Sequence, residues 1–165
     1  MKAKKLTHVG PGGEARMVDV SDKPVSSREA RARGAVRMSA PALEAIVRGN
    51  LPKGEVMATA RIAGIQAAKR ASDLIPMCHP LMLTLIDVDC VPDERLPGIR
   101  IEARVRCDGK TGAEMEALTA VAVAALTVVD MAKSVDRWMT IEGVELVEKR
   151  GGKSGELRRP ASGRS

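Results

Sequence analysis

Residues 99–108, IRIEARVRCD, alternate strictly between apolar and charged side chains. The odd positions are apolar and the even ones charged, and this period of two predicts a strand with one buried face. Residues 82–91 predict a partner strand, joined to the first through the turn sequence PDERLPG. The pair favours an antiparallel sheet that turns one face toward a core.

Helical patterns lie on both sides of this pair. Residues 54–72 are rich in helix-forming residues and have apolar side chains at helical spacing, which predicts a helix. Pro76 ends this helical pattern. Residues 113–135 have almost no polar face, so we expect the sheet and a second subunit to cover that helix together. A strand at 31–38, a short helix from Ala40 to Gly49 and a strand at 139–148 complete the order strand, helix, helix, strand, strand, helix, strand. The order predicts an α+β fold, a ferredoxin-like antiparallel sheet with helices packed on one face.

The length of 165 residues suits one domain. We expect a flexible N-terminal arm over residues 1–26, a single ferredoxin-like catalytic domain over 27–155, and a basic disordered tail over 156–165.

The net charge of +6 lies at the ends of the chain. Residues 1–5 carry +3 and residues 150–165 carry +4, which leaves −1 for residues 6–149. With Trp138 as the sole aromatic side chain, stacking platforms for bases are missing, so we expect no nucleic-acid partner. The longest apolar run, residues 117–129, is too short to span a bilayer. Three cysteines without a CxxC pair indicate a reduced cytoplasm and no metal site.

Charged residues that interrupt the apolar helix are the first candidates for chemistry. Asp130 and Lys133 are neighbours at i, i+3 on a helix that offers no obvious solvated face. A buried ion pair is costly to desolvate and therefore favours a functional site over a structural one. Glu116 lies fourteen residues away, roughly 21 Å along a helix. The two residues would therefore serve opposite ends of a long ligand or, as we favour, two copies of the site formed where chains meet.

Two loops repeat a Gly-Lys-hydroxyl-Gly pattern, GKTG at 109–112 and GKSG at 152–155. Neither is a P-loop, because Arg104 and Val147 stand where that motif needs glycine. The first loop leads into a helix N-terminus, where anions bind, and Thr111 with Glu114 matches a capping box. Together with Lys53 and Lys69, the loops favour a polyphosphate ligand. His79, between Pro76 and Pro80, lies on a constrained turn and could transfer protons near neutral pH.

Three long segments carry a resemblance. Residues 53–81, 109–133 and 148–155 (KGEVMATARIAGIQAAKRASDLIPMCHPL, GKTGAEMEALTAVAVAALTVVDMAK and EKRGGKSG) resemble the molybdenum cofactor biosynthesis protein C family, the cyclic pyranopterin monophosphate synthases. The likeness runs from Leu6 to Gly155 and includes Thr7 and His8 near the N-terminus.

The resemblance implies a ferredoxin-like subunit in a homohexamer, a trimer of dimers with sites between subunits. It implies a lyase that converts 3′,8-cyclo-7,8-dihydro-GTP to cyclic pyranopterin monophosphate and releases pyrophosphate, without a redox cofactor; magnesium is not indicated by the sequence. By motif position, Asp130 is the catalytic acid or base and Lys133 its partner, and Lys53 belongs to the site. The substrate-contacting positions are Met77, Cys78, His79, Met115, Glu116, Lys149 and Lys153.

Two alternatives remain open at this point. A non-catalytic, nucleotide-sensing ferredoxin-like module would bind a nucleotide through the glycine loops and return it unchanged. A basic nucleic-acid binder would lose affinity steeply with salt.

Overall fold

The structure, a computed structural model, describes residues 12–160. In chain order its elements are β1 (Ser26–Arg37), α1 (Ala40–Val47), α2 (Val56–Lys69), α3 (Ala71–Leu74), β2 (Leu83–Asp93), β3 (Gly98–Gly109), α4 (Glu114–Ala132), β4 (Thr140–Arg150) and β5 (Leu157–Arg158). The predicted order is present, with α3 and β5 added. Thr7 and His8, in the predicted flexible arm, lie outside the described residues.

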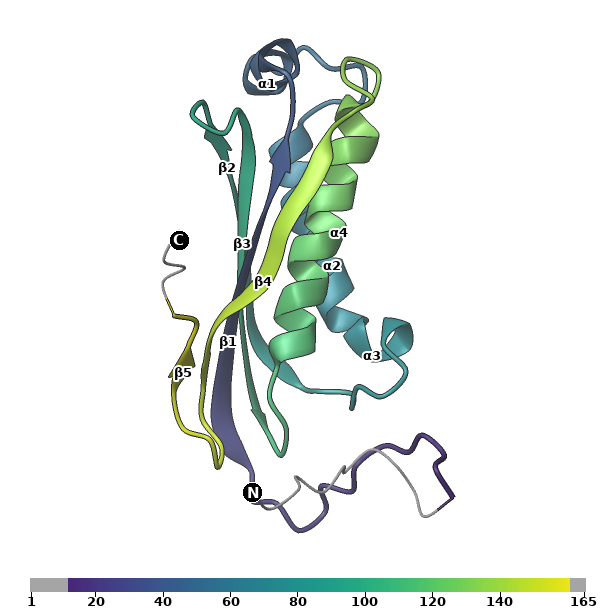
Figure 1. Ribbon diagram of the computed structural model, residues 1–165, viewed down its shortest axis with the longest axis vertical. Coiled ribbons are helices and arrows are strands. Elements are labelled where there is room, and N and C mark those ends of the chain that lie inside the picture. The colour runs from purple at the N-terminus through teal and green to yellow at the C-terminus, as the bar shows by residue number, and fades with distance from the viewer. Residues whose placement is uncertain (1–11, 161–165) are drawn as a thin grey trace.

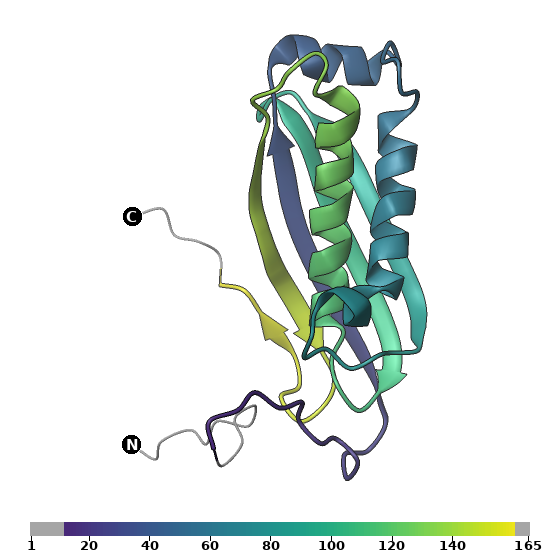
Figure 2. The ribbon, with the colours of Figure 1, turned by 90° about the vertical axis from the view of Figure 1, so that its right-hand side faces the viewer.

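The five strands form one antiparallel sheet in the order β2-β3-β1-β4-β5. In the central strand β1, Ala32 lies opposite Ala103 of β3 on one side and Leu146 of β4 on the other. Both long helices, α2 and α4, lie on the same side of this sheet (Figure 1) and run side by side (Figure 2). The predicted α+β, ferredoxin-like arrangement is confirmed.

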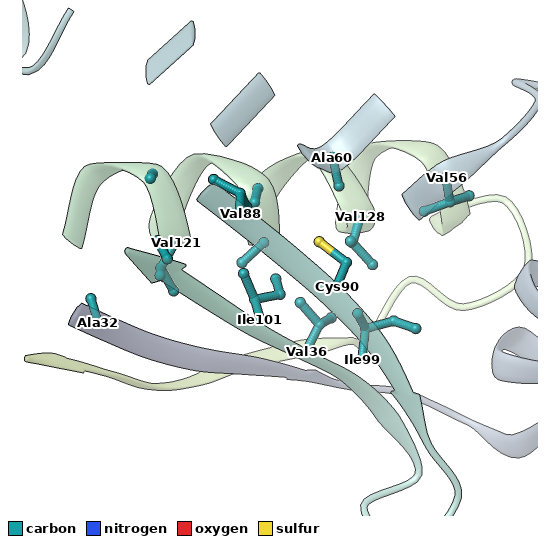
Figure 3. Close-up of a cluster of buried hydrophobic side chains, with 14 of the residues drawn as sticks. Ala32, Val36, Val56, Ala60, Val88, Cys90, Ile99, Ile101, Val121 and Val128 are labelled. Carbon is teal, nitrogen blue, oxygen red and sulfur yellow. The ribbon is translucent and has the colours of Figure 1, made fainter. Parts of the chain in front are cut away.

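The core lies between the sheet and these two helices. Ile99 and Ile101 of β3 are fully buried, whereas Arg100 and Glu102 are exposed, as the period of two predicts. Figure 3 shows the apolar side chains of the sheet facing Val121 and other side chains of α4. The core side chains are mostly Ala, Val and Ile, so the layers pack closely.

The packing is also close where α2 lies against α4. A Cβ atom added at Gly64 of α2 would lie 2.9 Å from the carbonyl oxygen of Ala120 and 3.2 Å from the side chain of Val88. Glycine at this position therefore lets the two helices approach one another. It also fixes the position of α2 along the axis of α4.

By length and composition alone, α4 could cross a membrane, but 56% of its most apolar window is buried inside this chain. It packs on β1, β3, β4 and α2, which is the environment of a core helix. Leu126 in its middle is 57% exposed, so one stripe of α4 is uncovered in the single chain. Coverage by a second subunit stays a prediction.

Several predicted boundaries differ from the structure. The helix expected over 54–72 is divided into α2 and α3 because Arg70 departs from helical geometry, with φ −114° and ψ 13°. The capping box of Thr111 and Glu114 is wrong, since Ala113 precedes α4 without a side-chain cap and Glu114 pairs with Lys149.

The predicted disorder of the tail is wrong where the structure describes it. Leu157–Arg158 form β5, with Leu157 opposite Lys149 of β4, and the Arg159 backbone N–H donates to the Val147 carbonyl. Arg158 also forms a salt bridge with Glu148, whose side chain is almost completely buried. The basic side chains that predicted a solvated tail instead pair with acidic side chains of β4.

Candidate active site

An upper cluster, formed by Lys53, Asp130 and Lys133, lies at the end of the molecule where α4 finishes. Asp130 is in the last turn of α4, Lys133 is the residue that caps it, and Lys53 comes from the loop between α1 and α2. Figure 1 shows that loop beside the C-terminal end of α4. Two segments far apart in the sequence thus supply one charged cluster.

The Asp130 carboxylate accepts hydrogen bonds from both lysines. Lys133 Nζ lies 2.7 Å from Oδ1, and Lys53 Nζ lies 2.6 Å from Oδ2. Lys53 also donates to the backbone carbonyl of Asp130 at 3.1 Å. The hydrogen bonds from Lys133 and then Lys53 hold the pKa of Asp130 at about 2, so the carboxylate is ionised at neutral pH.

The prediction that Asp130 and Lys133 form a buried pair is wrong for the single chain. Their side chains are 55% and 59% exposed, because α4 leaves the core at its last turn. A carboxylate at this position meets the negative end of the helix dipole, which disfavours it. Helix stability therefore does not explain Asp130, whereas two converging lysines do give it a defined chemical environment.

The upper cluster borders a depression of about 450 Å³. Lys53, Asp130, Lys133 and Arg137 line it, together with Val129, Met131 and Ser134. Three of these side chains are cationic and one is anionic, so an anionic ligand with exchangeable protons fits this surface.

A lower cluster, formed by Cys78, Glu114, Glu116 and Lys149, lies at the opposite end of α4. Glu114 and Glu116 belong to the first turn of α4, Cys78 to the loop after α3, and Lys149 to β4. The Cys78 thiol donates to Glu116 Oε1 at 3.4 Å, and Lys149 forms a salt bridge with Glu114. The Glu114–Lys149 pair was missed in the sequence, because the capping-box pattern gave Glu114 a different role.

Glu116 is the most deeply buried charged residue of this cluster, with 2% exposed. Burial raises its pKa, and its Oε2 atom has no hydrogen-bond partner among residues 12–160. Burial and the nearby Glu116 carboxylate also raise the pKa of the Cys78 thiol to about 11. Cys78 therefore stays a protonated donor at neutral pH and is not a nucleophile.

The other predicted substrate positions gather near the lower cluster or at its edge. His79 and Met77 are half-buried in the loop between α3 and β2, and Met115 is half-buried in the first turn of α4. Lys153 is exposed in the loop between β4 and β5, and Lys69 is exposed at the end of α2. The predicted site residues thus form two groups at opposite ends of α4, as the spacing of Glu116 and Asp130 requires.

Among residues 12–160, no group of three or more His, Cys, Asp or Glu side chains could hold a metal ion. The three cysteines are free thiols, and Cys90 and Cys107 are buried.

Comparison with known sequences finds a family match over most of the chain. The sequence model of the MoaC family matches residues 17–152. The chain belongs to the MoaC family. The match includes every residue of both clusters, whereas Lys153 and β5 lie beyond it.

Relatives of this MoaC-family chain cover nearly all of its length. A cyclic pyranopterin monophosphate synthase of Methylobacterium sp. (strain 4-46) is 59% identical over 150 residues, which is 91% of this chain and 94% of the relative. Proteins of the same name from Brucella ovis and Brucella melitensis biotype 2 are 57% identical over 152 residues, 92% of each chain. The resemblance seen in the sequence is confirmed.

Proposed function

We propose that this chain is a cyclic pyranopterin monophosphate synthase of molybdenum cofactor biosynthesis, a lyase that converts 3′,8-cyclo-7,8-dihydro-GTP to cyclic pyranopterin monophosphate and pyrophosphate. The observation that carries the proposal is the Asp130 carboxylate held between Lys53 and Lys133 in a MoaC-family chain. Relatives at 57–59% identity that bear this name support it.

The upper cluster fits the proton transfers of this reaction. Opening the five-membered ring of the purine and rebuilding it as a pterin requires protons to be removed and added at several atoms. Asp130 is ionised at neutral pH, so it accepts a proton or orients a lysine, and the ammonium groups of Lys53 and Lys133 are the donors within reach. Each group therefore has a role, and no redox cofactor is required.

The lower cluster fits binding of the substrate. Pyrophosphate release builds negative charge, which lysines and backbone N–H groups stabilise electrostatically. Lys149 and Lys153, with Lys69 nearby, supply positive charge at this end of the molecule. Met77 and His79 are half-buried in the loop between α3 and β2, and Met115 is half-buried in the first turn of α4. These side chains would contact the base or the sugar, and His79 would add a further proton-transfer group.

The distance between the two clusters bears on the assembly. Fourteen residues of helix separate Glu116 from Asp130 by roughly 21 Å, too far for both to contact one small reacting centre within a chain. We therefore propose a homohexamer, a trimer of dimers in the cytoplasm, in which the lower cluster of one subunit faces the upper cluster of another. The uncovered stripe around Leu126 supports contact between subunits.

Incubation of the purified chain with 3′,8-cyclo-7,8-dihydro-GTP tests the reaction. Mass analysis should show cyclic pyranopterin monophosphate, and pyrophosphate should appear in equal amount. A nucleotide-sensing module would bind the substrate and return it unchanged, and that outcome would overturn the proposal. EDTA treatment before the assay tests whether magnesium contributes.

Mixed assemblies test the sharing of sites. Lys53 and Asp130 bind each other within one chain. The two inactive subunits must therefore carry substitutions in different clusters, one in the upper cluster and one in the lower cluster. Co-expressed Asp130→Asn and Lys149→Ala subunits should regain about a quarter of wild-type activity, since random pairing restores one site in four. No recovery would show that both clusters act from the same subunit.

A further inference from the structure

Arg137 lies in the loop between α4 and β4, beside the upper cluster. This loop connects the C-terminal end of α4 to β4 at the same end of the molecule as α1 (Figure 1). Arg137 lines the same depression of about 450 Å³ as the three residues of the upper cluster. The sequence motifs assign it no role, so its place in this depression comes from the tertiary structure alone.

The backbone beside Arg137 is held by hydrogen bonds. The Asp136 N–H donates to the Ala132 carbonyl at 3.2 Å, which ties the loop to the end of α4. The Asp136 carboxylate accepts from the backbone N–H of Ser39 at 2.7 Å and from that of Trp138 at 2.9 Å, which ties the loop to the start of α1. Arg137 therefore extends from a fixed loop, and this reduces the entropy lost when a ligand binds.

The positive charge of Arg137 is not offset by a neighbouring carboxylate. Asp136, the preceding residue, uses both carboxylate oxygens on backbone N–H groups. Asp130 uses both of its oxygens on the two lysines of the upper cluster. Arg137 is exposed and forms no salt bridge with any carboxylate in the part of the chain that the structure describes. Its five N–H donors are therefore available to a ligand in the depression.

A carbonyl group on a planar ring fits these donors. The proton transfers of the proposed reaction take place on the fused ring of the substrate, so this ring has to lie within reach of Asp130, in the depression that Arg137 lines. The six-membered ring of guanine carries a carbonyl oxygen, and 3′,8-cyclo-7,8-dihydro-GTP keeps it because only the five-membered ring is changed. Arginine binds this edge of guanine through its planar fork, whereas adenine presents an amino group, a donor, at the same position.

We propose that Arg137 binds the ring carbonyl of the substrate and so selects a guanine-derived ring over an adenine-derived one. The identity of the ring rests on the proposed function, whereas the unpaired donors in the depression follow from the contacts of Arg137 and its neighbours. Arg137 is then a specificity-determining residue, and the upper cluster supplies the groups that move protons.

Titration calorimetry with GTP, ITP and ATP tests the site without turnover. The three nucleotides carry the same triphosphate, so the ratios of their affinities depend on the ring alone. ITP keeps the ring carbonyl of GTP without its amino group, whereas ATP has an amino group in place of the carbonyl. Wild-type protein should bind GTP and ITP about ten- to a hundred-fold more tightly than ATP.

Variants of Arg137 should lose this preference. Arg137→Met has no donor and should bind the three nucleotides with similar affinity. Arg137→Lys keeps the charge without the fork and should keep only part of the preference. The matched control is Arg95→Met, which replaces an exposed arginine of the turn between β2 and β3, outside the depression, and should keep the wild-type preference.

Three outcomes overturn the inference. The first is wild type that binds GTP no better than ATP, or that binds neither. The second is ITP bound as weakly as ATP, because the amino group of guanine would then be recognised instead of the carbonyl. The third is an equal loss of affinity for all three nucleotides in Arg137→Met, which would place a phosphate at Arg137.

Turnover assays separate this inference from the proposed function. Conversion of the cyclic substrate by wild type, together with an unchanged KM in Arg137→Met, would remove Arg137 and leave the function. A preference for GTP that depends on Arg137, without any conversion by wild type, would leave the inference and overturn the function.

Discussion

Lys53 Nζ lies 2.6 Å from the Asp130 carboxylate, although 77 residues separate the two in the sequence. The pair forms because the loop between α1 and α2 passes the C-terminal end of α4. It places Lys53, Asp130 and Lys133 in one chain, so a substrate that needs all three meets them on a single subunit.

Replacing Asp130 or Lys133 should stop the reaction without unfolding the protein. Both side chains are more than half exposed, so their ion pair adds little stability, and Asp130→Asn and Lys133→Ala should lower the melting temperature only slightly. Loss of a general acid or base should reduce pyrophosphate release about 10²- to 10⁴-fold. Arg48→Ala, which breaks an exposed ion pair on α1, should retain full activity as the control. Full turnover by either site variant would exclude that residue from the mechanism.

The two lysines should control the titration of Asp130. In Lys53→Met or Lys133→Met the pKa of Asp130 should rise from about 2 toward the ordinary value of 3.8, because one stabilising hydrogen bond and one positive charge are lost. Carboxyl-carbon NMR measures this pKa directly. Lys133 has the larger effect on this pKa, so its variant should show the greater rise. An unchanged pKa in both variants would contradict the geometry of the upper cluster.

The same pKa shift predicts how stability depends on acid. An aspartate with a lowered folded-state pKa contributes stability above pH 3.8, and that contribution is lost as the pH falls toward 2. Urea unfolding between pH 5 and 2 should therefore show a smaller decline for Asp130→Asn than for wild type. Equal declines would mean that the ion pairs of Asp130 do not persist in solution.

Glu116 should behave in the opposite sense. Its folded-state pKa is raised by burial, so the folded protein loses stability relative to the unfolded chain as the pH rises above 4.5. Glu116→Gln removes the charge and keeps the shape, and should flatten this decline, measured by thermal unfolding from pH 4 to 8. Because Glu116 is a predicted substrate contact, the variant should also raise KM. A variant with the wild-type pH profile would show that the carboxyl group is not buried in solution.

Gly64 should resist substitution even by alanine. Helix propensity favours Gly64→Ala by up to about 1 kcal/mol, but a Cβ atom would press on the Ala120 carbonyl and Val88, and such overpacking costs about 1–3 kcal/mol. We expect a net loss of about 1–2 kcal/mol in the free energy of unfolding, measured with urea. Gln66→Ala, exposed on the same helix, should cause no loss. A more stable Gly64→Ala would show that α2 and α4 are not in close contact there.

The sequence by itself determined the architecture and the family. The alternation over 99–108 and the apolar run over 113–135 depend on neighbouring residues alone, so they predict which faces are buried before the chain is folded. The motifs around Asp130 and PMCHP likewise identify the family, because they are contiguous in the chain. Even the separation of Glu116 from Asp130 follows from the rise of one helix.

Only the tertiary structure decided which residues meet. The contact of Lys53 with Asp130, the pair of Glu114 with Lys149 and the bond from Ser39 to Asp136 join segments that no local pattern connects. The exposure of Asp130 depends on where α4 leaves the core. The strand formed by Leu157–Arg158 depends on the edge of β4 that is free to pair with it. Local periodicity specifies the elements, whereas distances between side chains of distant segments are set when the layers pack.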